Sequence, residues 1–95
     1  MKRLKITLRA RRDLMDIAGH IAAHNETAAL KVGKKLTQTI RDLAVRNTGR
    51  YGRLEETWEK SVTGLPYVIV YHFLKDDILE ILRVIHTRRN WPAGE

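Results

Sequence analysis

The sequence predicts an α+β domain, in which an N-terminal strand and an antiparallel helical hairpin precede a three-stranded antiparallel meander. Three observations predict it. Apolar residues alternate with a period of two near the N-terminus, recur at helical spacing in the next segment, and return to strand-like runs afterwards. With 95 residues, the chain is expected to form a single domain over residues 1–95.

The first two elements follow from a change of period. Residues 2–8 alternate apolar and polar side chains, which predicts a strand with one buried face. From Ala10 the apolar residues recur every three or four positions, which predicts a helix over residues 11–23. Asp13 and Asp16 lie near its expected start, where the helix dipole favours acidic side chains.

A second helix is predicted over residues 27–45, with Asn25 or Thr27 as its N-cap. The short connection makes the two helices an antiparallel hairpin. Gly33 lies inside this helix, where it costs about 1 kcal/mol relative to alanine. Close packing against the first helix would explain it.

Three strands are expected after the helices, over residues 55–62, 67–73 and 78–86. The turns at 63–66 and 74–77 are short, so the three strands must form an antiparallel meander. Together with the N-terminal strand they form one sheet, and the two helices cover only one of its faces.

The last two strands are apolar on both faces, so one apolar face is left without a helix to cover it. An uncovered apolar face on a monomer marks an interaction site. The alternatives are that the ends of the chain or the loop of residues 46–56 fold over this face, or that the chain forms a homodimer.

Composition narrows the class of partner. Eighteen Lys and Arg residues against 11 Asp and Glu residues give a net charge of +7, which favours nucleic acid, a ribosome or an acidic protein; a basic surface without any partner is the alternative. The chain has no cysteine and its four His are scattered, so we expect no disulfide and no metal site. No apolar run approaches a membrane span, and a cytoplasmic location is expected.

The end of the last strand is unusually charged. Arg83 stands in the middle of the apolar run "LEILRVIH". Three further basic residues follow directly: His86, Arg88 and Arg89. An unpaired charge is costly in a core strand. We therefore expect Arg83 either to lie on an outer docking face or to pair with an acid such as Glu80 or Glu55.

Four segments resemble, in order and spacing, the ParE branch of the RelE/ParE toxin superfamily. They are "ARRDLMDIAGHIAAHNETAA", "GRYGR", "LPYVIVYHF" and "EILRVIHTRRNWP". The most specific feature is "PYVIVY" about a dozen residues before "RVIHTRR". The chain departs from the family pattern at Glu26, where Asn-Pro is frequent, at Asn47, where Pro is frequent, and at His72, where Arg is frequent.

The resemblance implies the toxin half of a bacterial type II toxin–antitoxin pair, which inhibits growth through DNA gyrase, needs no cofactor, and is neutralised by a cognate antitoxin. Operator DNA is expected to be bound only through the antitoxin. The expected target-binding residues are Arg83, His86, Arg88, Arg89 and Trp91. The antitoxin is expected on the outer face of the sheet, at Val68, Val70, His72, Leu79, Ile81 and Ile85.

The alternative is the RelE branch, whose members cut messenger RNA in the ribosomal A site. The catalytic residues would then be His86, Arg88 and Arg89, with His86 as general acid or base. Cleavage also needs a second proton-transfer group, and no Tyr follows Tyr71 in this chain. A third class, a single-stranded RNA binder, would stack bases on aromatic residues that core packing explains equally well: Tyr51, Trp58, Tyr67 and Trp91.

Overall fold

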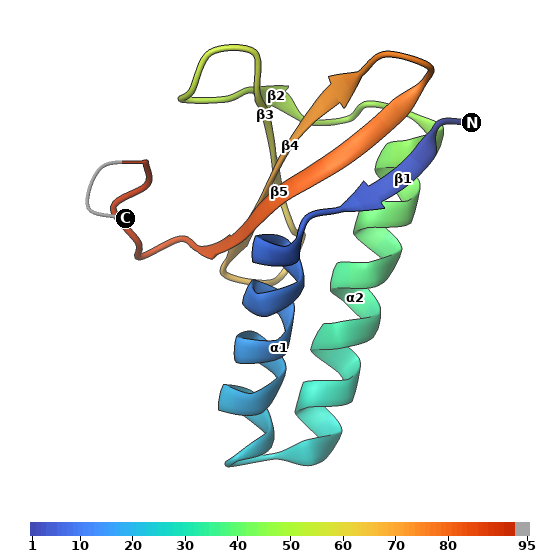
Figure 1. Cartoon of the computed structure of the whole chain (residues 1–95). Coiled ribbons are helices and arrows are strands. Elements are labelled where there is room, and N and C mark those ends of the chain that lie inside the picture. The colour runs from blue at the N-terminus through green and yellow to red at the C-terminus, as the bar shows by residue number, and fades with distance from the viewer. Residues whose placement is uncertain (93–95) are drawn as a thin grey trace.

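A five-stranded sheet carries both helices against the same face, as Figure 1 shows. The structure is a computed structural model that describes residues 1–92. The order of strands across the sheet is β1-β5-β4-β3-β2. The elements are β1 (Arg3–Ile6), α1 (Leu8–Ala22), α2 (Glu26–Val45), β2 (Arg50–Tyr51), β3 (Trp58–Ser61), β4 (Tyr67–Leu74) and β5 (Ile78–His86). The predicted fold class is confirmed.

The N-terminal strand and the meander form one sheet, as expected. β1 pairs with β5 in parallel. β4 lies between β3 and β5 and pairs with both of them in antiparallel fashion. The parallel pairing of β1 follows from the hairpin of helices that separates it from the other strands, because a parallel neighbour needs a long crossover. β1 ends opposite Ile81, so the second half of β5 is an edge on that side.

Both helices begin with a side-chain cap. Thr7, which the alternation placed in the strand, accepts the backbone N–H of Ala10 through Oγ1 at 3.0 Å, and α1 therefore begins earlier than predicted. Asp13 consequently lies beyond the first turn, and the explanation by the helix dipole is wrong for it. Asn25 caps α2 as predicted, accepting from the N–H of Ala28 at 3.0 Å.

Gly33 does not mark a close helix–helix contact. A methyl group added at Gly33 would meet no atom within 4 Å, so the expected reason for this glycine is wrong. Among residues 1–92, the one element that the sequence did not predict is β2, which has only two residues and pairs Arg50 with Glu59 and Tyr51 with Trp58. So short a strand carries no periodic signal.

The core lies between the helices and one face of the sheet. Leu36, Ile40 and Leu43 of α2 pack there with alternate residues of β4 and β5. The sheet residues on this face are Tyr67, Ile69, Tyr71, Leu79, Ile81 and Val84. Leu79 and Ile81 therefore belong to the core, and their expected place on an outer antitoxin-binding face is wrong.

A β-bulge separates the two halves of β5. Tyr71 pairs with Ile81 and Val70 pairs with Arg83, so Leu82 is an extra residue between the two pairs. Without this residue, strict alternation would send Arg83 to the same face as Leu79 and Ile81, into the core. The bulge is thus the backbone feature that accommodates a charged residue in an otherwise apolar strand.

Candidate functional site

Arg83 forms a buried ion pair with Asp13 of α1. Its Nε and Nη2 donate to Asp13 Oδ2 and Oδ1 at 2.8 and 3.3 Å, and only 11% of the Arg83 side chain and 10% of the Asp13 side chain are exposed. The expectation that Arg83 lies on an exposed docking face is therefore wrong. The alternative of an ion pair holds, but its partner is neither Glu80 nor Glu55.

Asp13 also accepts a backbone N–H group at the edge of the sheet. Its Oδ2 accepts the backbone N–H of Val84 at 2.9 Å, at a point where β1 has already ended. A second interaction extends this edge, because Thr7 Oγ1 donates to the carbonyl of Leu82 at 3.2 Å. One carboxylate thus satisfies both a buried guanidinium and an edge amide, which ties α1 to the end of β5.

Directly after β5 the chain makes a tight turn built on His86. The Nδ1 atom of His86 accepts the backbone N–H of Arg88 at 3.0 Å, and its carbonyl accepts the N–H of Arg89 at 2.9 Å. The His86 ring also meets the Tyr67 ring edge-on, with centroids 5.4 Å apart. Arg88 and Arg89 are exposed on this turn, so the predicted basic cluster is presented to solvent at the end of the last strand.

Trp91 is held from two sides. Its ring lies 5.5 Å from Cζ of Arg83, in a cation–π contact, and its carbonyl accepts from Nη1 of Arg53 at 3.0 Å. Arg53 precedes β3 in the chain, and Figure 1 shows the C-terminal segment bending back towards the loop between β2 and β3. The Trp91 indole N–H is buried and has no hydrogen-bond partner among the described residues.

Arg53 is in turn fixed by Glu59, which is almost fully buried. Arg53 donates to the Glu59 carboxylate through its backbone N–H, Nε and Nη2, at 2.9, 3.2 and 3.0 Å. Burial by itself raises the pKa of Glu59, but the hydrogen bonds of Arg53 and the charges of Arg53 and Arg50 hold it below its usual value. The carboxylate is therefore ionised, and it locks Arg53 in place.

The outer face of the sheet is not an open apolar surface. Val68, Val70 and Ile85 are only 6%, 0% and 4% exposed, and His72 is half-buried beside Glu80, with Nε2 2.6 Å from Oε1. The expectation of an uncovered apolar face is wrong. The bond from Arg53 to Trp91 links the 46–56 loop to the C-terminal segment, in line with the alternative that these parts of the chain fold back.

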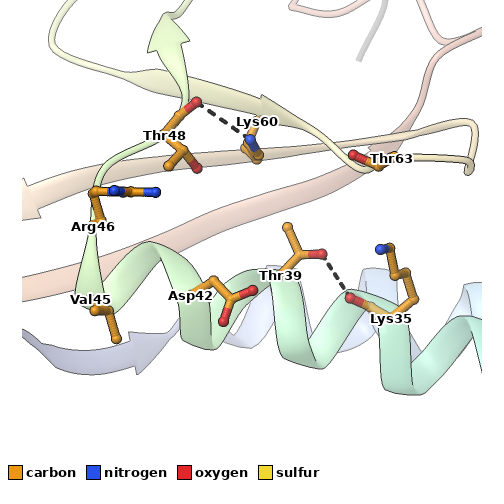
Figure 2. Close-up of a pocket in the computed structure, with 8 residues that line it drawn as sticks. All are labelled: Lys35, Thr39, Asp42, Val45, Arg46, Thr48, Lys60 and Thr63. Carbon is orange, nitrogen blue, oxygen red and sulfur yellow. Dashed lines mark hydrogen bonds between the residues drawn. The ribbon is translucent and has the colours of Figure 1, made fainter.

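A basic groove, defined by the residues of Figure 2, lies elsewhere, between the C-terminal half of α2 and β3. Figure 2 shows side chains of the helix on one side, and on the other Lys60 of β3, Thr63 just after it and Thr48 from the segment between α2 and β2. The cavity measures about 570 Å³. Its lining residues are Lys35, Thr39, Asp42, Val45, Arg46, Thr48, Lys60 and Thr63. No signal in the sequence shows that α2 and β3 bring Lys35 and Lys60 together.

The aromatic residues do not form one stacking platform. Tyr67 is buried in the core and Trp91 packs on Arg83. Tyr51 and Trp58 stack on each other, with centroids 4.5 Å apart. Three of the four rings pack within the chain and Tyr51 is 82% exposed, so the four do not make the continuous platform of the single-stranded RNA alternative.

Two further features bear on the class of site. Within residues 1–92, no group of three or more His, Asp or Glu residues is placed to hold a metal ion. Over the same stretch, neither helix is long and apolar enough to cross a membrane.

Solved structures identify the class to which this fold belongs. A chain of the chromosomal ParDE toxin–antitoxin system from P. aeruginosa is similar with a TM-score of 0.80 and 23% identity, covering 90% of this chain and 96% of that one. A chain of the RelBE2 toxin–antitoxin complex from Mycobacterium tuberculosis is similar with a TM-score of 0.53 and 24% identity, covering 90% of each chain. The fold is that of the RelE and ParE toxins.

Sequence comparison identifies the family. The model of the family described as "ParE toxin of type II toxin-antitoxin system, parDE" matches residues 4–91. The protein named "Putative toxin Y4kP" from Sinorhizobium fredii is 36% identical over 92 residues, which are 96% of this chain and 94% of that protein. This chain belongs to the ParE toxin family of type II toxin–antitoxin systems, and the predicted resemblance is confirmed.

Proposed function

We propose that this toxin inhibits DNA gyrase in the bacterial cytoplasm by docking on it, without catalysing a reaction of its own. The observation that carries this proposal is the distribution of charge at the end of β5. Arg83, the most central cation, is buried against Asp13, whereas Arg88 and Arg89 are exposed on a turn. Exposed charges of this kind steer and orient a macromolecular partner.

A ribonuclease would place different demands on the same residues. Cleavage of RNA needs a base, a proton donor and cations aimed at the charge that develops on the phosphate. His86 is one proton-transfer group, and its Nδ1 is already engaged by the N–H of Arg88. Arg83 is committed to Asp13. RelE-like cleavage of messenger RNA therefore remains the second candidate, with His86 Nε2 as its general acid or base.

A cognate antitoxin is the partner that neutralises the toxin in this proposal, and operator DNA is bound only through it. The basic groove is the surface that suits it. Lys35, Arg46 and Lys60 outnumber the single carboxylate of Asp42 there, so an acidic segment would complement the groove. This location replaces the outer sheet face, because the residues expected to bind the antitoxin there are buried or half-buried in the chain.

Supercoiling by purified gyrase tests the proposal. Wild-type toxin should inhibit the reaction, and Arg88→Ala/Arg89→Ala should weaken that inhibition about tenfold or more without loss of folding, since exposed charges contribute little to stability. The matched control is Lys31→Ala/Lys34→Ala, which removes the same charge from exposed positions on α2 and should change nothing.

His86→Ala separates the two candidates. Under the docking proposal its effect on gyrase inhibition is milder than that of Arg88→Ala/Arg89→Ala, because no proton is transferred and only one of the two hydrogen bonds at His86 is lost. Under the nuclease alternative, codon-phased cuts appear in messenger RNA on ribosomes. His86→Ala then lowers the rate of cleavage by a factor of about 10²–10⁴. Such cuts, together with unimpaired gyrase, would refute the proposed target.

A further inference from the structure

We propose that Arg53 and Arg83 are positioning residues that clamp Trp91 and thereby hold the docking turn, residues 87–90, in the orientation that presents Arg88 and Arg89. The inference rests on the proposed function of that turn as the contact with gyrase. Neither Arg53 nor Arg83 touches the target in this arrangement. Each acts through Trp91.

The first half of the clamp is Arg53. Three of its N–H groups are directed at the buried carboxylate of Glu59, and a further one, on Nη1, reaches the carbonyl of Trp91 at 3.0 Å. A planar guanidinium can serve two acceptors at once because its donors diverge in a fixed fork. The ion pair with Glu59 thus aims the remaining donor at the C-terminal segment.

The second half is Arg83. Its guanidinium is held by Asp13 through Nε and Nη2 and lies 5.5 Å from the centre of the Trp91 ring. Trp91 is therefore fixed through its backbone by a residue of the 46–56 loop and through its ring by a residue of β5. These two anchors come from segments 30 positions apart in the chain, 53 and 83.

The clamp matters because the docking turn is not part of any helix or strand. At its near end the turn is tied to β5 by the two hydrogen bonds at His86, and at its far end the anchor is Trp91. A segment fixed at both ends has already lost the conformational freedom that binding would otherwise take away. Release of the far end should therefore weaken docking although both docking arginines are still present.

Arg53→Lys tests the first half, because it keeps the charge but cannot bridge Glu59 and Trp91 together. The matched control is Arg50→Lys. Arg50 is also a neighbour of Glu59, with Nη2 3.6 Å from Oε1, but its Nη1 donates to Ser61 Oγ at 3.1 Å. Trp91→Ala tests the second half, because it removes the ring that faces Arg83 and keeps the backbone carbonyl that Arg53 binds.

Two readouts are measured on the whole chain. Nuclear magnetic resonance relaxation reports how ordered the backbone amides of the docking turn and the indole N–H of Trp91 are. The indole signal of Trp91 is identified as the one that remains in Trp58→Phe. Gyrase supercoiling reports potency. We expect Arg53→Lys and Trp91→Ala to raise mobility in the docking turn and to lower potency about tenfold or more, measured well below the thermal unfolding midpoint of each variant; Arg50→Lys should leave both readouts at the wild-type level.

The two readouts also separate the failure of this inference from the failure of the proposed function. If wild-type toxin does not inhibit gyrase, the proposed function fails, and the relaxation measurement still decides whether the clamp exists. A docking turn that stays as ordered in Arg53→Lys as in wild type would overturn the clamp. Increased mobility with undiminished gyrase inhibition would overturn its role in docking. If Arg53→Lys does not fold, Arg53→Gln takes its place in the test of the first half, and Trp91→Ala still tests the second half.

Discussion

Asp13→Ala should be among the most destabilising single substitutions on the surface of α1 that faces β5. The Asp13 carboxylate accepts from Nε and Nη2 of Arg83 and from the backbone N–H of Val84, at 2.8, 3.3 and 2.9 Å. Alanine removes the carboxylate that pairs with the buried Arg83 guanidinium and that accepts the edge amide of Val84. Breaking a buried ion pair in this way costs about 3–5 kcal/mol.

This loss is large for a domain of this size. Native domains have free energies of unfolding of about 5–15 kcal/mol. For a domain of 60–100 residues, each 1 kcal/mol shifts Tm by about 4–8 °C, so Tm should fall by well over 10 °C. Urea unfolding followed by circular dichroism measures the free energy directly. The control Asp16→Ala removes an exposed carboxylate from the same helix and should change it by no more than about 0.5 kcal/mol.

A double-mutant cycle decides whether the ion pair is the cause. Arg83→Met replaces the guanidinium by a shorter, unbranched apolar side chain, and Asp13→Ala/Arg83→Met then carries neither charge of the pair. The double variant should be more stable than Asp13→Ala alone, because the charge left behind dominates the loss. If Asp13→Ala costs less than about 1 kcal/mol, or if the two substitutions are additive, the reasoning is wrong.

Four further substitutions test the remaining structure. Because Arg53 holds the pKa of Glu59 below its usual 4.5, Glu59 stabilises the fold above that value; the free energy of unfolding should fall as the pH drops through the lowered pKa, with a smaller slope in Glu59→Gln. Burial raises the pKa of Tyr71 to about 12, so an absorbance titration should show a phenol that ionises near pH 12 and is missing in Tyr71→Phe. Gly49→Ala should destabilise by about 1–3 kcal/mol, because its Cβ would collide with the Tyr71 hydroxyl and lie 2.7 Å from a backbone carbonyl. Gly33→Ala, with open space around it, should instead stabilise by about 1 kcal/mol, and thermal unfolding of the two glycine variants compares them directly.

The elements that packing periodicity encodes could be read from the sequence. β4 and β5 were predicted almost to the residue, because both faces of each strand are apolar and turns bound them. The start of α1 was placed too late, since Thr7 continues the alternation of the strand while its hydroxyl caps the helix. β2 was missed, because a two-residue strand is defined only by its pairing with β3.

The candidate site was predicted less completely. The exposed arginines of the docking turn follow from the sequence, since a run of charges after an apolar strand must reach solvent. The sequence did not predict that Asp13 pairs with Arg83, or that Arg53 pairs with Glu59. Nothing local distinguishes Asp13 from Asp16, and the choice between them is made by the helix phase relative to β5.

What the sequence by itself determined is the order of the elements, the excess of positive charge and the motifs of the ParE family, because these depend on composition and local period. Only the tertiary structure decided that Arg83 is buried and that Asp13 is its partner. One extra residue in β5, Leu82, reverses the alternation after Ile81 and turns Arg83 out of the core. Its carboxylate partner, Asp13, lies 70 positions away in the sequence. The strength of an ion pair depends on the distance between atoms in space, and the separation of two residues along the chain does not determine that distance.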